Sequence, residues 1–184
     1  FIFLAILGCD TPREVTVVDI SPAIVPQPQK MDVRAGINVL MPGISIIPAS
    51  EAEAASAEVL KTMMTAIDWQ ASITQNRSNG NYVKLTLEED ATANPESYKL
   101  KIEGGVKLTA PTEQGLFYGM QSLIQMLPTD GNAANLPFVD IEDAPRFPYR
   151  GMHLDVGRHM YSVDFIKKYI THFTIIISIM TMNI

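Results

Sequence analysis

The residues best suited to chemistry lie close together in the stretch from Arg150 to His159 of the 184-residue chain. This stretch holds two arginines, an aspartate and two of the three histidines. A guanidinium presents several hydrogen-bond donors in a rigid fork, so an arginine can hold two adjacent hydroxyl groups of a ligand. An aspartate three residues before an arginine could orient it, or could simply form a surface ion pair with it. Both interpretations stay open for Asp155 and Arg158.

The histidines do not form a metal site by their pattern. His153 and His159 fall in a predicted strand and the loop after it, without the carboxylate or cysteine partners that zinc requires. Cys9 is the single cysteine, which excludes an internal disulfide and a cysteine-rich metal site. We therefore predict no metal and no cofactor. Several acidic residues flank predicted turns, and we interpret them as solvated surface: Glu88, Glu89, Asp140, Glu142 and Asp143.

The strands that precede this stretch are predicted from short apolar or alternating runs. They are expected at Ile37 to Met41, Ile44 to Ile47, Tyr82 to Leu87, Tyr98 to Ile102, Val106 to Ala110 and Leu136 to Ile141. The pair Gly104 and Gly105 predicts a hairpin turn between the fourth and fifth of these strands.

Two helices are expected between the strands. Ser50 with Glu53 forms a capping-box pattern, and apolar residues at helical spacing follow it as far as Asp68. The second helix should begin at Pro111, which suits a first helical turn, and stop at Pro128. Two glycines inside the second helix, Gly115 and Gly119, suggest that a neighbouring element approaches closely there, although tolerated weak propensity is the alternative.

These elements predict an α+β domain over residues 24–144, with an antiparallel sheet packed against helices. The stretch after Asp143 is bracketed by prolines and reads as a domain boundary. With 47% hydrophobic and 18% charged residues, the chain has the composition of a globular protein. Its formal charge of -6 includes no basic run, so we predict no nucleic-acid partner.

The sequence from Pro145 to Ile170, PRFPYRGMHLDVGRHMYSVDFIKKYI, closely resembles the start of the catalytic barrel of glycoside hydrolase family 20. In that family a Pro-Arg-Phe segment leads into the first barrel strand, which ends in Asp-x-Ser-Arg-His. The resemblance implies a strand at Tyr149 to Val156 and a helix after it, and Gly157 departs from the usual serine. The hairpin and the second helix upstream resemble the family's small N-terminal domain. Residues 145–184 would then begin a (β/α)8 barrel.

The family resemblance implies a β-N-acetylhexosaminidase that releases terminal non-reducing N-acetylhexosamine from glycans by a substrate-assisted retaining mechanism. The family's sugar-binding arginine corresponds to Arg158, with Asp155 in support, and Arg150 we interpret as structural. The family's catalytic Asp-Glu pair does not follow Ile170, so we expect no catalytic residue in this chain and no turnover by it. The apolar residues 171–184 lack the helical stripe that precedes them, which is typical of a frameshift or premature end. The alternative is a non-catalytic, lipid-anchored glycan-binding or scaffold module.

The N-terminus resembles a lipoprotein signal. Residues 1–8 are an apolar run too short to span a bilayer, and the string from Ile6 to Cys9 resembles the bacterial lipobox. A buried cysteine in an ordinary strand is the alternative. We predict a lipid anchor at Cys9, a tether over residues 9–23, and a place in the bacterial cell envelope as a periplasmic or outer-membrane lipoprotein.

Overall fold

The computed structural model describes residues 21–75, 80–88, 93–151 and 153–170. The strands are β1 (Lys30–Leu40), β2 (Ile44–Pro48), β3 (Ala71–Ile73), β4 (Tyr82–Leu87), β5 (Tyr98–Ile102), β6 (Val106–Ala110) and β7 (Ala134–Asp143). The helices are the 3-10 turn η1 (Glu51–Glu53), α1 (Ala54–Thr65), α2 (Glu113–Met126) and a short helix at 163–170.

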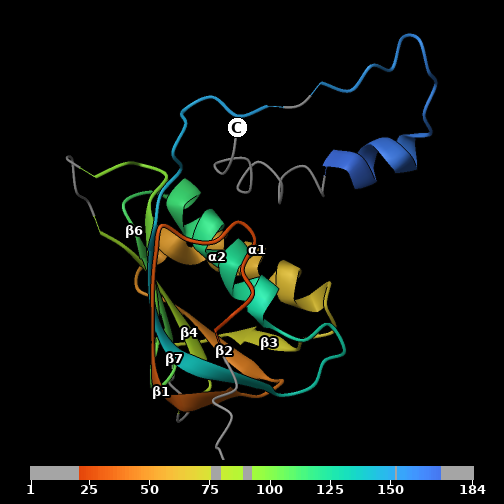
Figure 1. Ribbon diagram of the computed structural model, residues 1–184. Coiled ribbons are helices and arrows are strands. Elements are labelled where there is room, and N and C mark those ends of the chain that lie inside the picture. The colour runs from red at the N-terminus through yellow and green to blue at the C-terminus, as the bar shows by residue number, and fades with distance from the viewer. Residues whose placement is uncertain (1–20, 76–79, 89–92, 152, 171–184) are drawn as a thin grey trace, which may run out of the picture.

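The strands form one mixed sheet in the order β1-β7-β5-β6-β4-β2-β3 (Figure 1). The sheet has an antiparallel half and a parallel half. Neighbouring strands are antiparallel along β1-β7-β5-β6 and parallel along β6-β4-β2-β3. The prediction of an antiparallel sheet was therefore wrong for half of it. The physical reason is that α1 crosses from β2 to β3 over one face, and such a crossover brings the second strand in parallel to the first.

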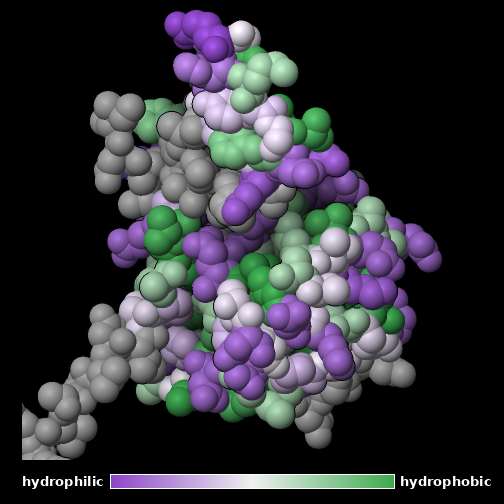
Figure 2. All heavy atoms as spheres, turned by 90° about the vertical axis from the view of Figure 1, so that its right-hand side faces the viewer, coloured by the Kyte–Doolittle hydropathy of each residue, from purple (hydrophilic) through white to green (hydrophobic). Residues whose placement is uncertain are grey.

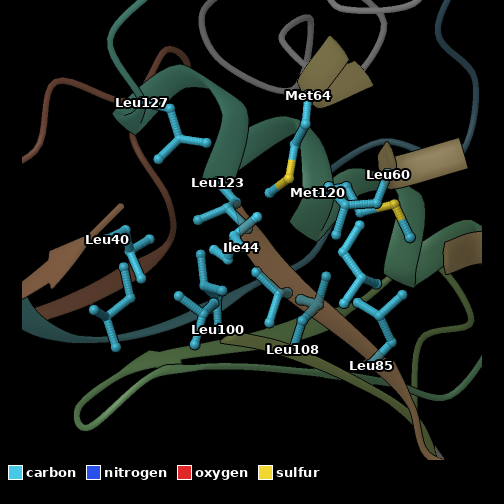
Figure 3. Packing of buried hydrophobic residues seen from close by; sticks show 14 of the residues in the cluster. Leu40, Ile44, Leu60, Met64, Leu85, Leu100, Leu108, Met120, Leu123 and Leu127 are labelled. Carbon is cyan, nitrogen blue, oxygen red and sulfur yellow. The ribbon is translucent and has the colours of Figure 1, made fainter. Parts of the chain in front are cut away.

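The two long helices cover one face of the sheet, and the hydrophobic core lies between the layers (Figures 1 and 3). Buried and exposed residues alternate along strands β5 and β6, as the sequence predicted. Leu100 and Leu108 therefore face the helices, whereas the lysines next to the apolar residues in each strand face solvent. From α1, Leu60 and Met64 reach the same core, and α2 adds Leu123.

The predicted helix starts are confirmed in one case and shifted in the other. Ser50 and Glu53 form the expected capping box at η1, which continues directly into α1. The second helix does not begin at Pro111. Thr112 is its N-cap and accepts a hydrogen bond from Gly115 N at 3.2 Å, so Pro111 lies just outside the helix.

The close approach expected at the two α2 glycines is confirmed. A Cβ at Gly115 would lie 2.2 Å from Ser97 O, and a Cβ at Gly119 would lie 2.2 Å from Leu108 Cδ1. Both distances are far below van der Waals contact. Glycine therefore lets α2 settle against β5, β6 and the turn before them.

Residues 144–151 and 153–170 leave the sheet beside the start of α2 and extend beyond the two layers (Figure 1). The helix expected after the barrel strand is present at 163–170. The strand predicted at Tyr149 to Val156 is not formed, because residues 149–151 and 153–156 have no strand assignment. A strand is stabilised by its neighbours, and no described strand lies alongside this segment.

On the face seen in Figure 2, hydrophilic and hydrophobic residues are interspersed. Within the described ranges, no helix has the length and apolar character needed to cross a membrane.

Candidate functional site

Arg158 and Asp155 meet in the loop before the short helix. Asp155 Oδ1 accepts hydrogen bonds from the backbone N–H groups of Gly157, at 2.9 Å, and Arg158, at 3.1 Å. Its Oδ2 accepts from Nε of the Arg158 guanidinium. The backbone N–H of Arg158, with help from its guanidinium and from Gly157 N–H, holds the pKa of Asp155 below its ordinary value. Asp155 is therefore ionised near neutral pH, and its ion pair with Arg158 is retained.

The geometry of the pair leaves the outer end of the guanidinium free to donate. Asp155 uses Nε, and the Arg158 side chain is 85% exposed. No hydrogen bond joins its two Nη groups to another described residue, so they can donate to two adjacent hydroxyls of a ligand. The contact between the two residues agrees with either interpretation left open for them.

The two histidines singled out in this stretch, His153 and His159, face solvent. Among the described residues, no three histidine, cysteine, aspartate or glutamate side chains are grouped so as to hold a metal. Cys9, the predicted lipidation site, lies outside the described residues.

The acidic residues near the end of β7 are only partly the solvated surface that we expected. Asp140 does pair with Arg34, at 3.2 Å. Asp143 instead is partly buried and accepts hydrogen bonds from Tyr98 Oη, at 3.3 Å, and Gln29 N, at 3.1 Å. Burial raises the pKa of Asp143, and these hydrogen bonds oppose the rise. Asp143 therefore connects the end of β7 to β5 and to the segment before β1, which is a structural role.

Arg150 points away from the Arg158 loop and back onto the domain. Its guanidinium pairs with Glu96, in the turn before β5, and contacts Tyr118 of α2. The interpretation of Arg150 as structural agrees with this geometry. Sequence reasoning missed Glu96 and Tyr118 as its partners, because nothing local marks a pair separated by 54 residues.

Comparison with known proteins identifies this arrangement. The model of the family described as Glycosyl hydrolase family 20, domain 2 matches residues 21–144, which hold the whole sheet and both long helices. The chain belongs to glycosyl hydrolase family 20.

Two similar proteins are named β-hexosaminidases. A β-hexosaminidase of Porphyromonas gingivalis is 38% identical over 100 residues, which are 50% of this chain and 13% of that protein. A β-hexosaminidase of Vibrio vulnificus is 28% identical over 152 residues, covering 82% of this chain and 17% of that protein. This chain thus spans less than a fifth of either relative.

Among solved structures, a mutant of Streptomyces plicatus β-hexosaminidase in complex with the product GlcNAc superposes with a TM-score of 0.71 and 27% identity. The match covers 84% of this chain and 32% of the Streptomyces chain. This structural match covers more of the chain than the family model, which matches residues 21–144, so the similarity extends beyond the sheet domain.

Proposed function

We propose that the protein to which this chain belongs is a β-N-acetylhexosaminidase, which hydrolyses terminal non-reducing N-acetylhexosamine residues of glycans. Membership of glycosyl hydrolase family 20 carries this proposal. It is supported by the names of the Porphyromonas and Vibrio relatives and by GlcNAc in the Streptomyces structure. None of these observations favours a non-catalytic scaffold.

Arg158 is the residue to which we assign substrate binding. Its Nε is bonded to the ionised Asp155, and its exposed Nη groups would donate to two neighbouring hydroxyls of the terminal sugar. Asp155 is the supporting residue, because its Oδ1 also ties down the backbone of the loop. Such positioning lowers the cost of ordering a long side chain when the sugar binds.

We assign the proton transfers to residues that this 184-residue chain does not contain. In substrate-assisted hydrolysis the 2-acetamido oxygen attacks the anomeric carbon, while an acid protonates the leaving oxygen and later activates water. A guanidinium is too weak an acid for this step. We infer that the 184-residue chain by itself can contribute to binding and has no hydrolytic activity.

Residues 145–170 are, in this proposal, the first strand and helix of a (β/α)8 barrel. Barrel enzymes place their binding residues at the C-terminal ends of strands and in the loops that follow. Arg158 would hold that position if residues 149–156 acquire neighbouring strands in the longer protein. The helix at 163–170 supports this assignment, since it follows the loop as a barrel helix would.

The test compares two proteins on an aryl N-acetylglucosaminide and on the matching aryl N-acetylgalactosaminide. The full-length product of the gene that encodes this chain should release the aryl group, and the 184-residue chain should not. Absence of turnover by the folded full-length product on both the gluco and galacto substrates would refute the proposed activity. Turnover by the 184-residue chain would refute our assignment of the proton transfers.

We also propose that Cys9 is acylated and that the protein is held in the bacterial cell envelope as a periplasmic or outer-membrane lipoprotein. The apolar run before Cys9 and the polar tether after it support this. The mass of protein extracted from membranes should lack residues 1–8 and carry added acyl groups. A soluble product whose Cys9 is unmodified would contradict the anchor.

A further inference from the structure

Arg150 is buried in a segment that is otherwise exposed. Its side chain is 4% exposed, whereas the preceding Tyr149 is 88% exposed and the following Gly151 is also exposed. A charged side chain is taken out of water only where partners satisfy it. The contacts around Arg150 therefore indicate what this part of the chain is fixed to.

The guanidinium of Arg150 is held by groups from three places. Its Nη2 and Nη1 donate to the two carboxylate oxygens of Glu96, at 2.5 and 3.1 Å. Nη1 also donates to Phe147 O at 2.6 Å, and Nη2 to Tyr118 Oη at 3.1 Å. The guanidinium carbon lies 5.7 Å from the centre of the Tyr118 ring. Bidentate pairing of this kind fixes orientation as well as distance.

The receiving side of the contact is itself built by α2. Gln114 Nε2 donates to Glu96 Oε1 at 2.6 Å and to Tyr118 Oη at 3.1 Å. The Tyr118 hydroxyl donates a hydrogen bond to Glu96 Oε1, at 3.1 Å, and its oxygen can therefore accept from both Gln114 and Arg150. The hydrogen bonds from Arg150 lower the pKa of Glu96, against the effect of burial, so the carboxylate is ionised near neutral pH.

We propose that Arg150 and Glu96 form a clamp that positions the Arg158 loop relative to the sheet domain. Arg150 is then a positioning residue for sugar binding, which it affects only through Arg158. This inference rests on the proposed function for the role of Arg158, but the clamp itself is a property of the chain and can be measured without any substrate.

The position of the clamp along the chain explains how it would act. The previous hydrogen-bonded anchor is Ala144, whose carbonyl accepts from Gln29 Nε2 at 2.5 Å. Arg158 lies fourteen positions after Ala144 in the chain, but only eight positions after Arg150. At about 3.3 Å per extended residue, the clamp shortens the reach of the tether from roughly 46 Å to roughly 26 Å. It thereby confines Arg158 to a much smaller volume.

The first experiment measures amide hydrogen exchange in the 184-residue chain. Glu96→Gln and Arg150→Gln should each raise exchange across residues 147–158 by about tenfold, because a charge-assisted bidentate pair is lost. Amides of β5, β6 and α2 beyond its first turn should be unchanged. The double variant should exchange no faster than either single one, since both remove the same contact.

Matched controls lie close by. Arg146 is exposed in the same segment, and Glu113 is exposed in the first turn of α2. Arg146→Gln and Glu113→Gln should leave exchange over residues 147–158 as in the wild type. Unchanged exchange in the Glu96→Gln and Arg150→Gln variants, or effects that add in the double variant, would overturn the clamp.

The second experiment tests the link to Arg158 in the full-length product. Arg150→Gln should lower kcat/KM about tenfold in the wild-type background, as expected for a displaced binding group. In an Arg158→Ala background the same change should have less than about a twofold effect, because no positioned group is left to displace. Equal losses in both backgrounds would mean that Arg150 acts on stability alone. An inactive wild-type product would refute the proposed function and leave the exchange result standing.

Discussion

Glu53 joins the start of helix α1 to the end of strand β4. Its Oε1 accepts a hydrogen bond from Leu87 N at 2.7 Å, and its Oε2 accepts one from Ser50 N, also at 2.7 Å. The residue is only 2% exposed. Burial by itself would raise the pKa of Glu53, but the hydrogen bonds from Leu87 and Ser50 overcome this and hold it below the ordinary value. A residue recognised in the sequence as half of a helix cap thus also ties the helix to the sheet.

Replacing Glu53 by glutamine should destabilise the domain. Glutamine has an NH2 donor group in place of one carboxylate oxygen, so the N–H of Leu87 or of Ser50 would lose its acceptor. We expect the free energy of unfolding to fall by about 1.5 to 3 kcal/mol. Urea denaturation of both proteins measures it. Glu58→Gln, on the exposed side of the same helix, is the control and should cost less than about 0.5 kcal/mol. Equal effects at the two positions would argue against the contact with Leu87.

The contribution of Glu53 should disappear in acid. Its pKa is lower in the folded state than in the unfolded state, where it is near 4.3. Stabilisation by such a group is present above the unfolded pKa and is lost as the pH falls through the folded pKa. The stability difference between wild type and Glu53→Gln should therefore be constant above about pH 5.5 and shrink below about pH 4.5. A difference that grows in acid would contradict the direction of the shift.

The sequence predicted what is set by neighbours along the chain. The hairpin at Gly104 and Gly105 is confirmed, with φ values of +60° and +117° that favour glycine. The stripe of α2 and the capping box at Ser50 are also confirmed, because both depend on residues within a few positions. Strand β3 (Ala71–Ile73) was missed, since three residues are too few to show an alternating pattern.

Contacts between residues far apart in the chain could not be predicted from the sequence. Alternation shows which side of a strand is buried and does not say which strand lies next to it, so the parallel pairs of β2 and β4 were not foreseen. The same limit applies to Glu96, which stands in a polar turn and has no local sign of its partner. At the candidate site, only Asp155 and Arg158 are close enough in sequence for their contact to be expected.

Alanine at the two α2 glycines should destabilise the protein to different degrees. In a helix, alanine is more favourable than glycine by about 1 kcal/mol, but at these two positions there is no room for its Cβ. At Gly115 the obstacle is the backbone carbonyl of Ser97, which is fixed by the turn, whereas at Gly119 it is the end of the Leu108 side chain, which can move. We expect Gly119→Ala to cost about 1 to 3 kcal/mol and Gly115→Ala more than that. Thermal unfolding checks the order, and a stabilised Gly115→Ala would show that α2 sits further from β5.

Serine at Gly157, the residue usual in the family, should be accepted. The nearest atom to an added Cβ is Asp155 Oδ1 at 3.6 Å, an ordinary contact. Stability should change by less than about 0.5 kcal/mol, and the N–H groups of residues 157 and 158 should keep their protection. Gly105→Ser is the matched contrast, since a Cβ there would lie 2.5 Å from the Tyr82 ring at a φ of +117°. Loss of protection at residues 157 and 158 in Gly157→Ser would mean that this loop needs glycine.

Under the proposed function, removal of the Arg158 side chain should impair sugar binding by the full-length product. Arg158→Ala leaves sugar hydroxyls without a charged partner, which typically costs on the order of 1.5 to 3 kcal/mol, so kcat/KM should fall by roughly 10-fold to 150-fold. Arg158→Lys keeps the charge but lacks the fork, and should recover only part of the loss. Because the side chain is exposed and bonded only to Asp155 among the described residues, the stability of the sheet domain should not change. Kinetics with an aryl N-acetylglucosaminide, alongside thermal unfolding, separates the two effects. An unchanged kcat/KM in a folded Arg158→Ala enzyme would show that another residue binds the sugar and that the pair with Asp155 is only a surface ion pair.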